Sequence, residues 1–364
     1  MTNIRLPGPI PLPENIRKSL SKQMINHRGP DYKTLLYRNT ENLKKIFCTS
    51  NDIYILTASG TGALEAAITN TLSPGDKVLC ASIGNFGERF GEIAKNFGAN
   101  VTMLSFDAGH AVDPDTLRNA LQKDPTIKAV LVTHNETNTG VTNNLKSISA
   151  IVKNEFNKLL LVDGISSVCS IPLETDKWQC DVVTSASQKG WVLPPGLAFI
   201  SFSKEAWDSY STSKMPKYYF DLGQYKKYYE MGQPPWTPAI SIMFSLDLSL
   251  TNLIDEGLEN IFKRHESIAN LTRTQIEKLG LKLLPVNHEV ASNTVTAVKV
   301  PPSINGSDLI STLRTKNDIE LAGGYGELKD KIFRIGHMGI VSESEINEVI
   351  EALRIYLNLS LIHI

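Results

Sequence analysis

Between about residues 50 and 203, short apolar segments alternate with segments that have the amphipathic pattern of helices. The apolar segments do not alternate with polar residues, which is typical of strands buried on both faces. This order predicts an α/β fold, a mostly parallel sheet with helices on both sides. Functional residues in such sheets gather beyond the carboxyl ends of the strands. Ser59, His134, Asp163 and the segment 187–189 fall at these positions.

The C-terminal third has a different pattern. Residues 204–250 are rich in Tyr, Pro and Gly, and we expect them to be irregular. A long helical pattern at 259–280 is followed by strand-like segments at 281–286, 294–300 and 332–336, with helices at about 306–316 and 342–357. The sequence therefore predicts an N-terminal arm (1–20), a large domain (21–254) and a small α+β domain (255–364).

Composition narrows the partners that we expect. A formal net charge of −1 over 364 residues gives no reason to expect nucleic acid or an anionic membrane. The N-terminus lacks an apolar signal segment, and the longest uncharged stretch, 231–246, contains prolines and is shorter than the roughly 20 residues that span a bilayer. The four cysteines have no metal-binding spacing. We expect a cytoplasmic protein that interacts with small molecules and has no metal site.

Two ionisable residues lie at the ends of neighbouring apolar segments. Asp163 ends LLLVDG, and Lys189 follows DVVTSAS in SASQKG. A carboxylate buried at a strand end needs a positive or hydrogen-bonding partner, which a protonated pyridine nitrogen would supply. A desolvated lysine keeps a neutral amine that can form a Schiff base with an aldehyde. If one cleft contains both residues, they predict pyridoxal phosphate as cofactor; a lysine on its own is more often a solvated surface group.

The segment TASGTGALEAA (57–67) predicts a strand that runs into a glycine turn and then a helix. Backbone N–H groups at such a helix N-terminus, with the hydroxyls of Ser59 and Thr61, can bind a phosphate. The segment also begins like a dinucleotide fingerprint, but Glu65 stands at the third glycine position. A single phosphate is therefore favoured over a dinucleotide, and a turn without a ligand remains possible on this segment alone.

Three further residues follow predicted strands or lie at their ends. Phe86 in IGNFGERFGE can stack on a heteroaromatic ring or simply pack in the core. Thr137 in THNETNTG can donate to a ring oxygen or a phosphate, or belong to a capped turn. Arg334 in IFRIGHMG can bind a carboxylate through two parallel hydrogen bonds, or serve as a structural arginine.

Taken together and in order, these segments resemble the class V aminotransferases of pyridoxal-phosphate fold type I, in particular the alanine/serine–glyoxylate (or pyruvate) branch. The resemblance extends over nearly the whole chain, and the motifs that carry it are LPGPIPLPENIRKSL, MINHRGPDYK, ASGTGALEAA, VDGISSV, SASQKG and FRIGHMG. It implies a large domain with a mostly parallel seven-stranded sheet and a smaller C-terminal α+β domain. Two positions depart from the family pattern: Leu6 replaces the opening threonine, and no tyrosine precedes Thr237.

The resemblance also implies roles for individual residues. Lys189 would form the Schiff base with the cofactor and move a proton, and Asp163 would pair with the pyridine nitrogen. The other residues that it places at the cofactor are Ser59, Gly60, Thr61 and Gln188 at the phosphate, Phe86 and Ile165 on the ring faces, and Thr137 near the ring hydroxyl. Gly8 and Arg334 would receive the substrate. Thr237 would reach the phosphate of a neighbouring subunit in a homodimer.

The implied reaction is a ping-pong transamination from alanine or serine to glyoxylate or pyruvate. Three alternatives stay open within the fold: another donor, such as aspartate or an aminophosphonate, a lyase, or a cysteine desulfurase. A desulfurase is disfavoured because no cysteine follows Cys180. A non-catalytic scaffold is disfavoured by the presence of Lys189, Asp163 and Arg334 together, and a nicotinamide dehydrogenase by Glu65.

Overall fold

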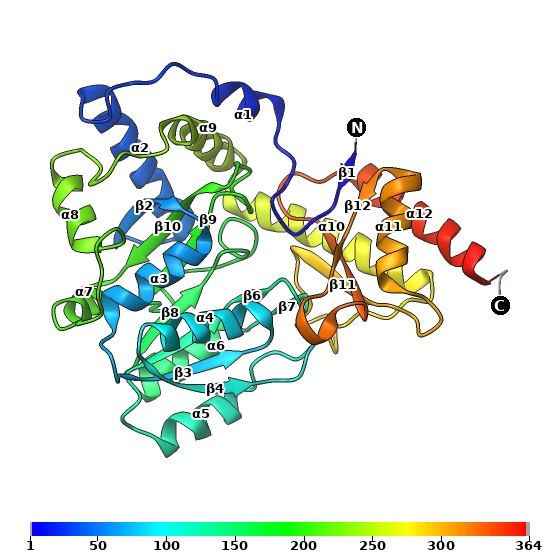
Figure 1. Ribbon diagram of the computed structural model, residues 1–364, viewed down its shortest axis with the longest axis horizontal. Coiled ribbons are helices and arrows are strands. Elements are labelled where there is room, and N and C mark those ends of the chain that lie inside the picture. Colours follow the sequence, from blue (N-terminus) through cyan, green and yellow to red (C-terminus); the bar gives the residue numbers. More distant parts are fainter. Residues whose placement is uncertain (1, 362–364) are drawn as a thin grey trace.

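The computed structural model describes residues 2–361. A larger part built on a seven-stranded sheet lies beside a smaller part built on a three-stranded sheet (Figure 1). The strands are β1 (Asn3–Ile4), β2 (Asp52–Ala58), β3 (Lys77–Ser82), β4 (Asn100–Ser105), β5 (Ala129–Thr133), β6 (Asn135–Glu136), β7 (Val141–Thr142), β8 (Leu159–Asp163), β9 (Val182–Ala186), β10 (Gly196–Phe202), β11 (Val295–Lys299), β12 (Ile319–Glu320), β13 (Ala322–Gly323) and β14 (Ile332–Gly336).

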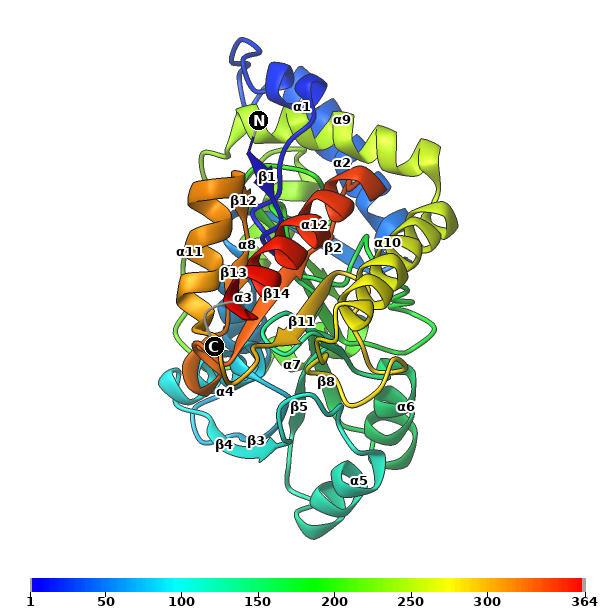
Figure 2. The ribbon, with the colours of Figure 1, turned by 90° about the vertical axis from the view of Figure 1, so that its right-hand side faces the viewer.

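The helices surround these sheets on both sides (Figures 1 and 2). They are α1 (Glu14–Ser19), α2 (Pro30–Phe47), α3 (Gly60–Thr71), α4 (Asn85–Asn96), α5 (Pro114–Lys123), α6 (Leu145–Ser149), α7 (Lys204–Tyr210), α8 (Leu222–Glu230), α9 (Ile240–Glu256), α10 (Leu258–Lys278), α11 (Gly306–Asn317) and α12 (Glu343–Leu361), with a π-helix, η1 (Ala150–Glu155), and a 3₁₀ turn, η2 (Gly326–Leu328).

The large sheet confirms the predicted α/β architecture. Its strand order is β2-β10-β9-β8-β5-β3-β4, and only β10 runs antiparallel to its neighbours. Successive residues of β5 belong to different hydrophobic clusters: Val130 and Val132 pack on one side, Ala129 and Leu131 on the other. Because strand side chains alternate between faces, both faces of the sheet are covered, which explains the continuous apolar strands.

Two expectations about secondary structure were wrong. Residues 204–250 are not irregular, since they form α7, α8 and most of α9. Their prolines lie between helices, so proline content obscured the helical segments. Residues 281–286 form no strand, only a single bridge between Leu283 and Val298. Pro285 lacks the N–H that a continued ladder needs. Helix α6 continues directly as the π-helix η1.

The N-terminal arm connects the two parts. Strand β1 pairs in parallel with β12 of the smaller part, where Asn3 lies opposite Ile319 (Figure 2). Further along, the Arg5 carbonyl accepts a hydrogen bond from the Gly336 N–H at 2.6 Å. The arm therefore follows the end of β14 before it reaches the large sheet, and this route brings Pro7 and Gly8 to Lys189.

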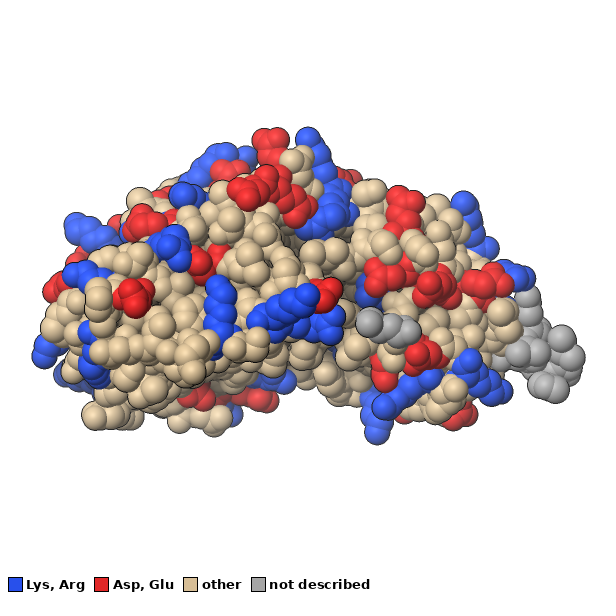
Figure 3. Space-filling view, turned by 90° about the horizontal axis from the view of Figure 1, so that it is seen from above, with Lys and Arg blue, Asp and Glu red and all other residues tan. Residues whose placement is uncertain are grey.

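The surface mixes both signs of charge. In the view of Figure 3, lysine and arginine side chains are interspersed with aspartate and glutamate, and neither sign covers the face. Of the helices within residues 2–361, none is both long and apolar enough to cross a membrane.

Candidate active site

A cavity of about 200 Å³ lies where the carboxyl end of β8 meets the N-terminus of α3. Every residue that the resemblance places at the cofactor or the substrate, except Thr237 and Arg334, lines it. The lining residues are Gly8, Ser59, Gly60, Thr61, Leu64, Phe86, Arg89, Asn135, Thr137, Asp163, Ile165, Ser166, Gln188 and Lys189. Within residues 2–361, no group of three His, Cys, Asp or Glu side chains is arranged to hold a metal ion.

Lys189 lies in the turn that follows β9, and its side chain points to the N-terminal arm. Its Nζ donates a hydrogen bond to the carbonyl of Pro7. The arm can pass this closely because residue 8 is glycine: a Cβ there would lie 2.8 Å from Nζ. Burial lowers the pKa of Lys189 to about 8; the charge of Arg334 adds to this effect and that of Asp163 opposes it. A neutral, nucleophilic amine is therefore accessible near physiological pH.

Asp163 is the last residue of β8 and is 4% exposed. Its Oδ1 accepts a hydrogen bond from the Ile165 N–H at 3.0 Å, whereas Oδ2 has only a long 3.5 Å contact with the Thr133 hydroxyl. Burial raises the pKa of Asp163 to about 6, against the lowering effects of the Ile165 hydrogen bond and the Lys189 charge. The carboxylate is ionised at neutral pH and can accept a further hydrogen bond inside the cavity.

The N-terminus of α3 forms the opposite end of the cavity. Ser59 is its N-cap residue, but the Ser59 side chain makes no capping hydrogen bond. A Cβ at Gly60 would lie 2.5 Å from Cδ1 of Ile165, so glycine lets the helix start directly beside the loop that follows Asp163. Across the cavity, Oε1 of Gln188 is buried without a hydrogen-bond partner. Free helical N–H groups and polar side chains around one space are the features that a phosphate needs.

The helix N–H groups, the Asp163 carboxylate and the Lys189 amine together fit pyridoxal phosphate. The N-terminus of α3 would hold the phosphate, Oδ2 of Asp163 would accept from the pyridine nitrogen, and the amine of Lys189 would meet the aldehyde. Phe86 on α4 and Ile165 line the same cavity and would enclose the ring. The residues present therefore agree with the cofactor that the sequence predicts.

Arg334 lies in the middle of β14 and is 2% exposed. Its Nε donates to the Gly323 carbonyl at 2.8 Å and its Nη1 to the Thr137 carbonyl at 3.0 Å. The ring of Tyr325 lies 4.7 Å from the centre of the guanidinium group. Arg334 does not line the cavity itself. It donates a hydrogen bond to the carbonyl of Thr137, and Thr137 lines the cavity.

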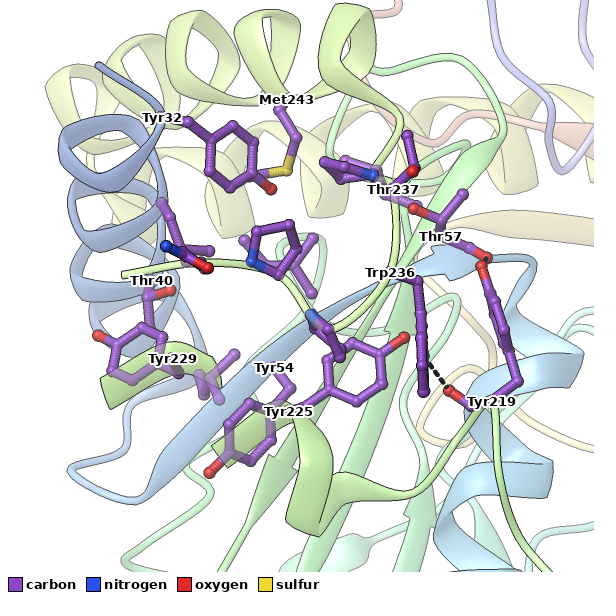
Figure 4. Close-up of a pocket in the computed structure, with 18 residues that line it drawn as sticks. Tyr32, Thr40, Tyr54, Thr57, Tyr219, Tyr225, Tyr229, Trp236, Thr237 and Met243 are labelled. Carbon is purple, nitrogen blue, oxygen red and sulfur yellow. Dashed lines mark hydrogen bonds between the residues drawn. The ribbon is translucent and has the colours of Figure 1, made fainter. Parts of the chain in front are cut away.

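Thr237 lies in a different place. It lines a narrow cavity together with aromatic side chains from α2, β2 and α8 (Figure 4). Next to it, the Trp236 indole donates to the Tyr219 carbonyl at 2.8 Å. Thr237 therefore belongs to a separate aromatic cavity and does not line the Lys189 cavity of its own chain.

Sequence reasoning missed several residues. Leu64, Arg89, Asn135 and Ser166 line the cavity but were not predicted. Arg89 lies one helical turn after Phe86, with its guanidinium 5.0 Å from that ring, so the helical spacing in NFGERF was a usable signal. Asn135 on β6 and Ser166 after β8 hydrogen-bond each other although they are 31 residues apart, which no local pattern reveals.

His134, although it follows β5, does not line the cavity. It is 3% exposed and packs edge-on against Trp178 with ring centres 6.1 Å apart. The His134 side chain therefore has a packing role, although it follows the end of a strand.

Comparison with known proteins identifies the family of the chain. The family model for class V aminotransferases matches residues 18–327. A soluble hydrogenase 42 kDa subunit from Anabaena cylindrica is 42% identical over 97% of this chain and 92% of its own. A serine–glyoxylate aminotransferase from Arabidopsis thaliana is 38% identical over 94% of this chain and 86% of its own.

Among solved structures, an alanine–glyoxylate aminotransferase from Nostoc sp. superposes with a TM-score of 0.94 at 29% identity, and the match covers 98% of this chain and 95% of that one. Family match, identity and fold therefore agree with one another: this chain belongs to the class V aminotransferases and has the fold type I architecture predicted from its sequence.

Proposed function

We propose that this protein is a pyridoxal-phosphate-dependent aminotransferase that moves the amino group of alanine or serine to glyoxylate or pyruvate by a ping-pong reaction. The observation that carries the proposal is the convergence of Lys189, Asp163 and the free N-terminus of α3 on one cavity. Aspartate or an aminophosphonate as donor, and lyase or desulfurase chemistry, remain the alternatives.

When bound, the cofactor accepts the amino group and delocalises the electron pair that remains at the substrate Cα after deprotonation. Lys189 moves the proton at Cα, because its buried amine is neutral in an appreciable fraction of molecules near neutral pH. Asp163 accepts a hydrogen bond from the ring nitrogen, and its charge stabilises the protonated ring. Phe86 and Ile165 exclude water from the ring faces.

Arg334 binds the carboxylate of the substrate and so orients the substrate in the cavity. Two of its N–H groups are already fixed by the carbonyls of Gly323 and Thr137, so the guanidinium plane is held before the substrate arrives. A fixed donor fork lowers the entropy cost of binding a carboxylate. Gly8 lies directly against the Lys189 side chain, where a Cβ would be 2.8 Å from Nζ, and would receive the substrate beside that amine.

We further propose that the protein acts as a cytoplasmic homodimer in amino acid metabolism. The family resemblance implies that Thr237 reaches the cofactor phosphate of the partner; in its own chain it lines a separate cavity. Near it, Tyr218 and Tyr219 are 78% and 42% exposed, and Tyr218 stacks on Trp236 at 5.1 Å. Exposed aromatic groups of this kind are typical of subunit interfaces.

Half-reactions test the proposed function. The purified protein, saturated with pyridoxal phosphate, is mixed with single amino acids without an acceptor, and the yellow absorption is followed. We expect alanine or serine to abolish the absorption, and glyoxylate or pyruvate to restore it. If no amino acid converts the cofactor to its aminated form, the aminotransferase proposal is wrong. If aspartate alone does so, the donor is misassigned but the reaction class stands.

A further inference from the structure

Glu136 is a buried carboxylate that the proposed reaction does not use. It is 0% exposed, and no cation among residues 2–361 forms an ion pair with it. Burial raises the pKa of Glu136 to about 7, and three backbone N–H groups oppose this rise by donating to the carboxylate: Oε2 accepts from Phe86 at 2.8 Å and Gly87 at 3.2 Å, and Oε1 accepts from Asn138 at 2.9 Å. A buried carboxylate costs several kcal/mol unless it is hydrogen-bonded, so both oxygens are in use.

The first two of these donors belong to the first turn of α4. The N-cap of that helix is Gly84, which has no side chain to accept from the free N–H groups. Glu136, on the short strand β6 after β5, supplies the acceptor instead. A Cβ at Gly84 would lie 2.8 Å from Cγ of Glu136, so the glycine provides the space that the glutamate occupies. The two residues together replace an ordinary N-cap side chain.

The groups that Glu136 connects are those that enclose the cofactor ring and the substrate. Phe86, whose N–H it binds, lines the cavity on α4. Thr137, the next residue along the chain, lines the same cavity, and the Thr137 carbonyl accepts from Nη1 of Arg334. Nearby, Tyr325 packs edge-on against Phe86 at 6.3 Å and over the guanidinium of Arg334 at 4.7 Å. One carboxylate thus fixes the stacking ring relative to the carboxylate-binding arginine.

We propose that Glu136 is a positioning residue, which holds Phe86 against the cofactor ring and, through Thr137, keeps Arg334 aligned for the substrate carboxylate. The inference rests on the proposed function, since it concerns the same cavity. Burial lowers the pKa of Arg334, and Tyr325 and, to a smaller extent, Glu136 oppose that lowering.

Glu136→Gln tests this proposal, because glutamine keeps the shape but replaces one acceptor oxygen with an NH₂ group that faces backbone N–H donors. We expect a folded, yellow protein whose visible circular dichroism is weakened, because Phe86 no longer holds the cofactor in a fixed asymmetric position. The dissociation constant for pyridoxal phosphate and the KM for the amino donor should each rise roughly tenfold, equivalent to one lost charge-assisted hydrogen bond.

The matched control is Glu88→Gln, the same change on an exposed glutamate two residues after Phe86 on α4. It should leave the circular dichroism, the cofactor affinity and KM unchanged. Gly84→Ala is a second test, since its Cβ displaces the Glu136 side chain without removing the charge, and it should change the same three quantities in the same direction.

The outcomes separate this inference from the proposed function. The inference alone would be overturned if the parent is yellow and active and the Glu136→Gln variant folds and has the same circular dichroism, cofactor affinity and KM as the parent. If Glu136→Gln does not fold, Gly84→Ala decides by the same criteria. A parent that takes up no pyridoxal phosphate would overturn both proposals.

Discussion

At the scale of single residues, the sequence was most informative where the chemistry depends on residue type and strand position. Lys189 and Asp163 could be identified because an ionisable residue at the end of an apolar strand needs a reason to be there. Glu136 was missed although it lies in the quoted segment THNETNTG. Two of its three partners are N–H groups about fifty residues earlier, and a backbone donor leaves no trace in the sequence. The roles assigned to all the cavity residues, Lys189 and Asp163 included, stay predictions.

The rate of cofactor uptake should increase with pH as Lys189 loses its proton. Only the neutral amine attacks the cofactor aldehyde, and burial lowers the pKa of Lys189 to about 8. The rate of uptake by the cofactor-free protein should therefore fall about tenfold for each pH unit below 8 and level off above it. Stopped-flow absorption measures this rate. A rate that keeps rising toward the ordinary lysine pKa of 10.5 would contradict the assignment.

Replacing Arg334 should weaken substrate capture and leave the cofactor in place. In Arg334→Ala, KM for the amino donor should rise roughly 10- to 100-fold, as expected for loss of hydrogen bonds from a charged group. Steady-state kinetics measures the change, and the yellow colour should persist. The control is Arg314→Ala, which removes an arginine whose side chain is 67% exposed and paired with Glu320. Loss of cofactor in Arg334→Ala would show that its role is misassigned.

At the scale of elements, periodicity predicted the strands and helices of residues 50–203 well, because each is short, apolar or amphipathic, and bounded by turns. Periodicity failed where prolines and the lack of charged residues obscured a helical pattern. The uncharged stretch before Asp247 reads as an irregular segment, yet it includes the first half of α9, which packs on α2. The π-helix η1 follows α6, and no proline or glycine in the sequence marks the change from one helix type to the other.

The close approach of α3 to the loop after β8 gives an element-scale prediction. In Gly60→Ala, the new Cβ would overlap Ile165, pushing the helix N-terminus away from the phosphate position. Alanine is a better helix former than glycine by about 1 kcal/mol, so weaker binding cannot come from helix propensity. Titration with pyridoxal phosphate should show affinity reduced roughly tenfold, the loss of about one hydrogen bond to a charged group.

The double variant Gly60→Ala/Ile165→Ala removes the overlapping atoms and should bind more tightly than Gly60→Ala alone. If the two changes are simply additive, contact with Ile165 is not the reason that residue 60 is glycine.

At the scale of the whole molecule, the fold class and the family followed from six motifs in order, and the comparisons bear them out. The boundaries expected at residues 20 and 254 stay predictions. The route of the N-terminal arm was not predictable, because β1 pairs with β12 more than 300 residues away and only the folded chain brings Pro7 to Lys189. The homodimer remains a proposal that depends on Thr237.

Mixing two defective variants tests the homodimer. If Thr237 serves the partner's site, a heterodimer of Lys189→Ala and Thr237→Ala chains contains one site with both residues intact. Subunits that are mixed by unfolding and refolding should then recover up to about a quarter of the parent activity, since half of the dimers are mixed and each has one intact site. Activity no greater than the average of the two variants would show that Thr237 does not act across subunits.

The central claim is that Lys189 is the residue to which pyridoxal phosphate binds covalently. The most direct measurement is borohydride reduction of the yellow protein, followed by protease digestion and peptide mass mapping. We expect one reduced pyridoxyl group, on the peptide that contains Lys189, and none in a Lys189→Ala variant treated in the same way. A group on another lysine, or a parent that stays colourless with excess pyridoxal phosphate, would contradict the claim.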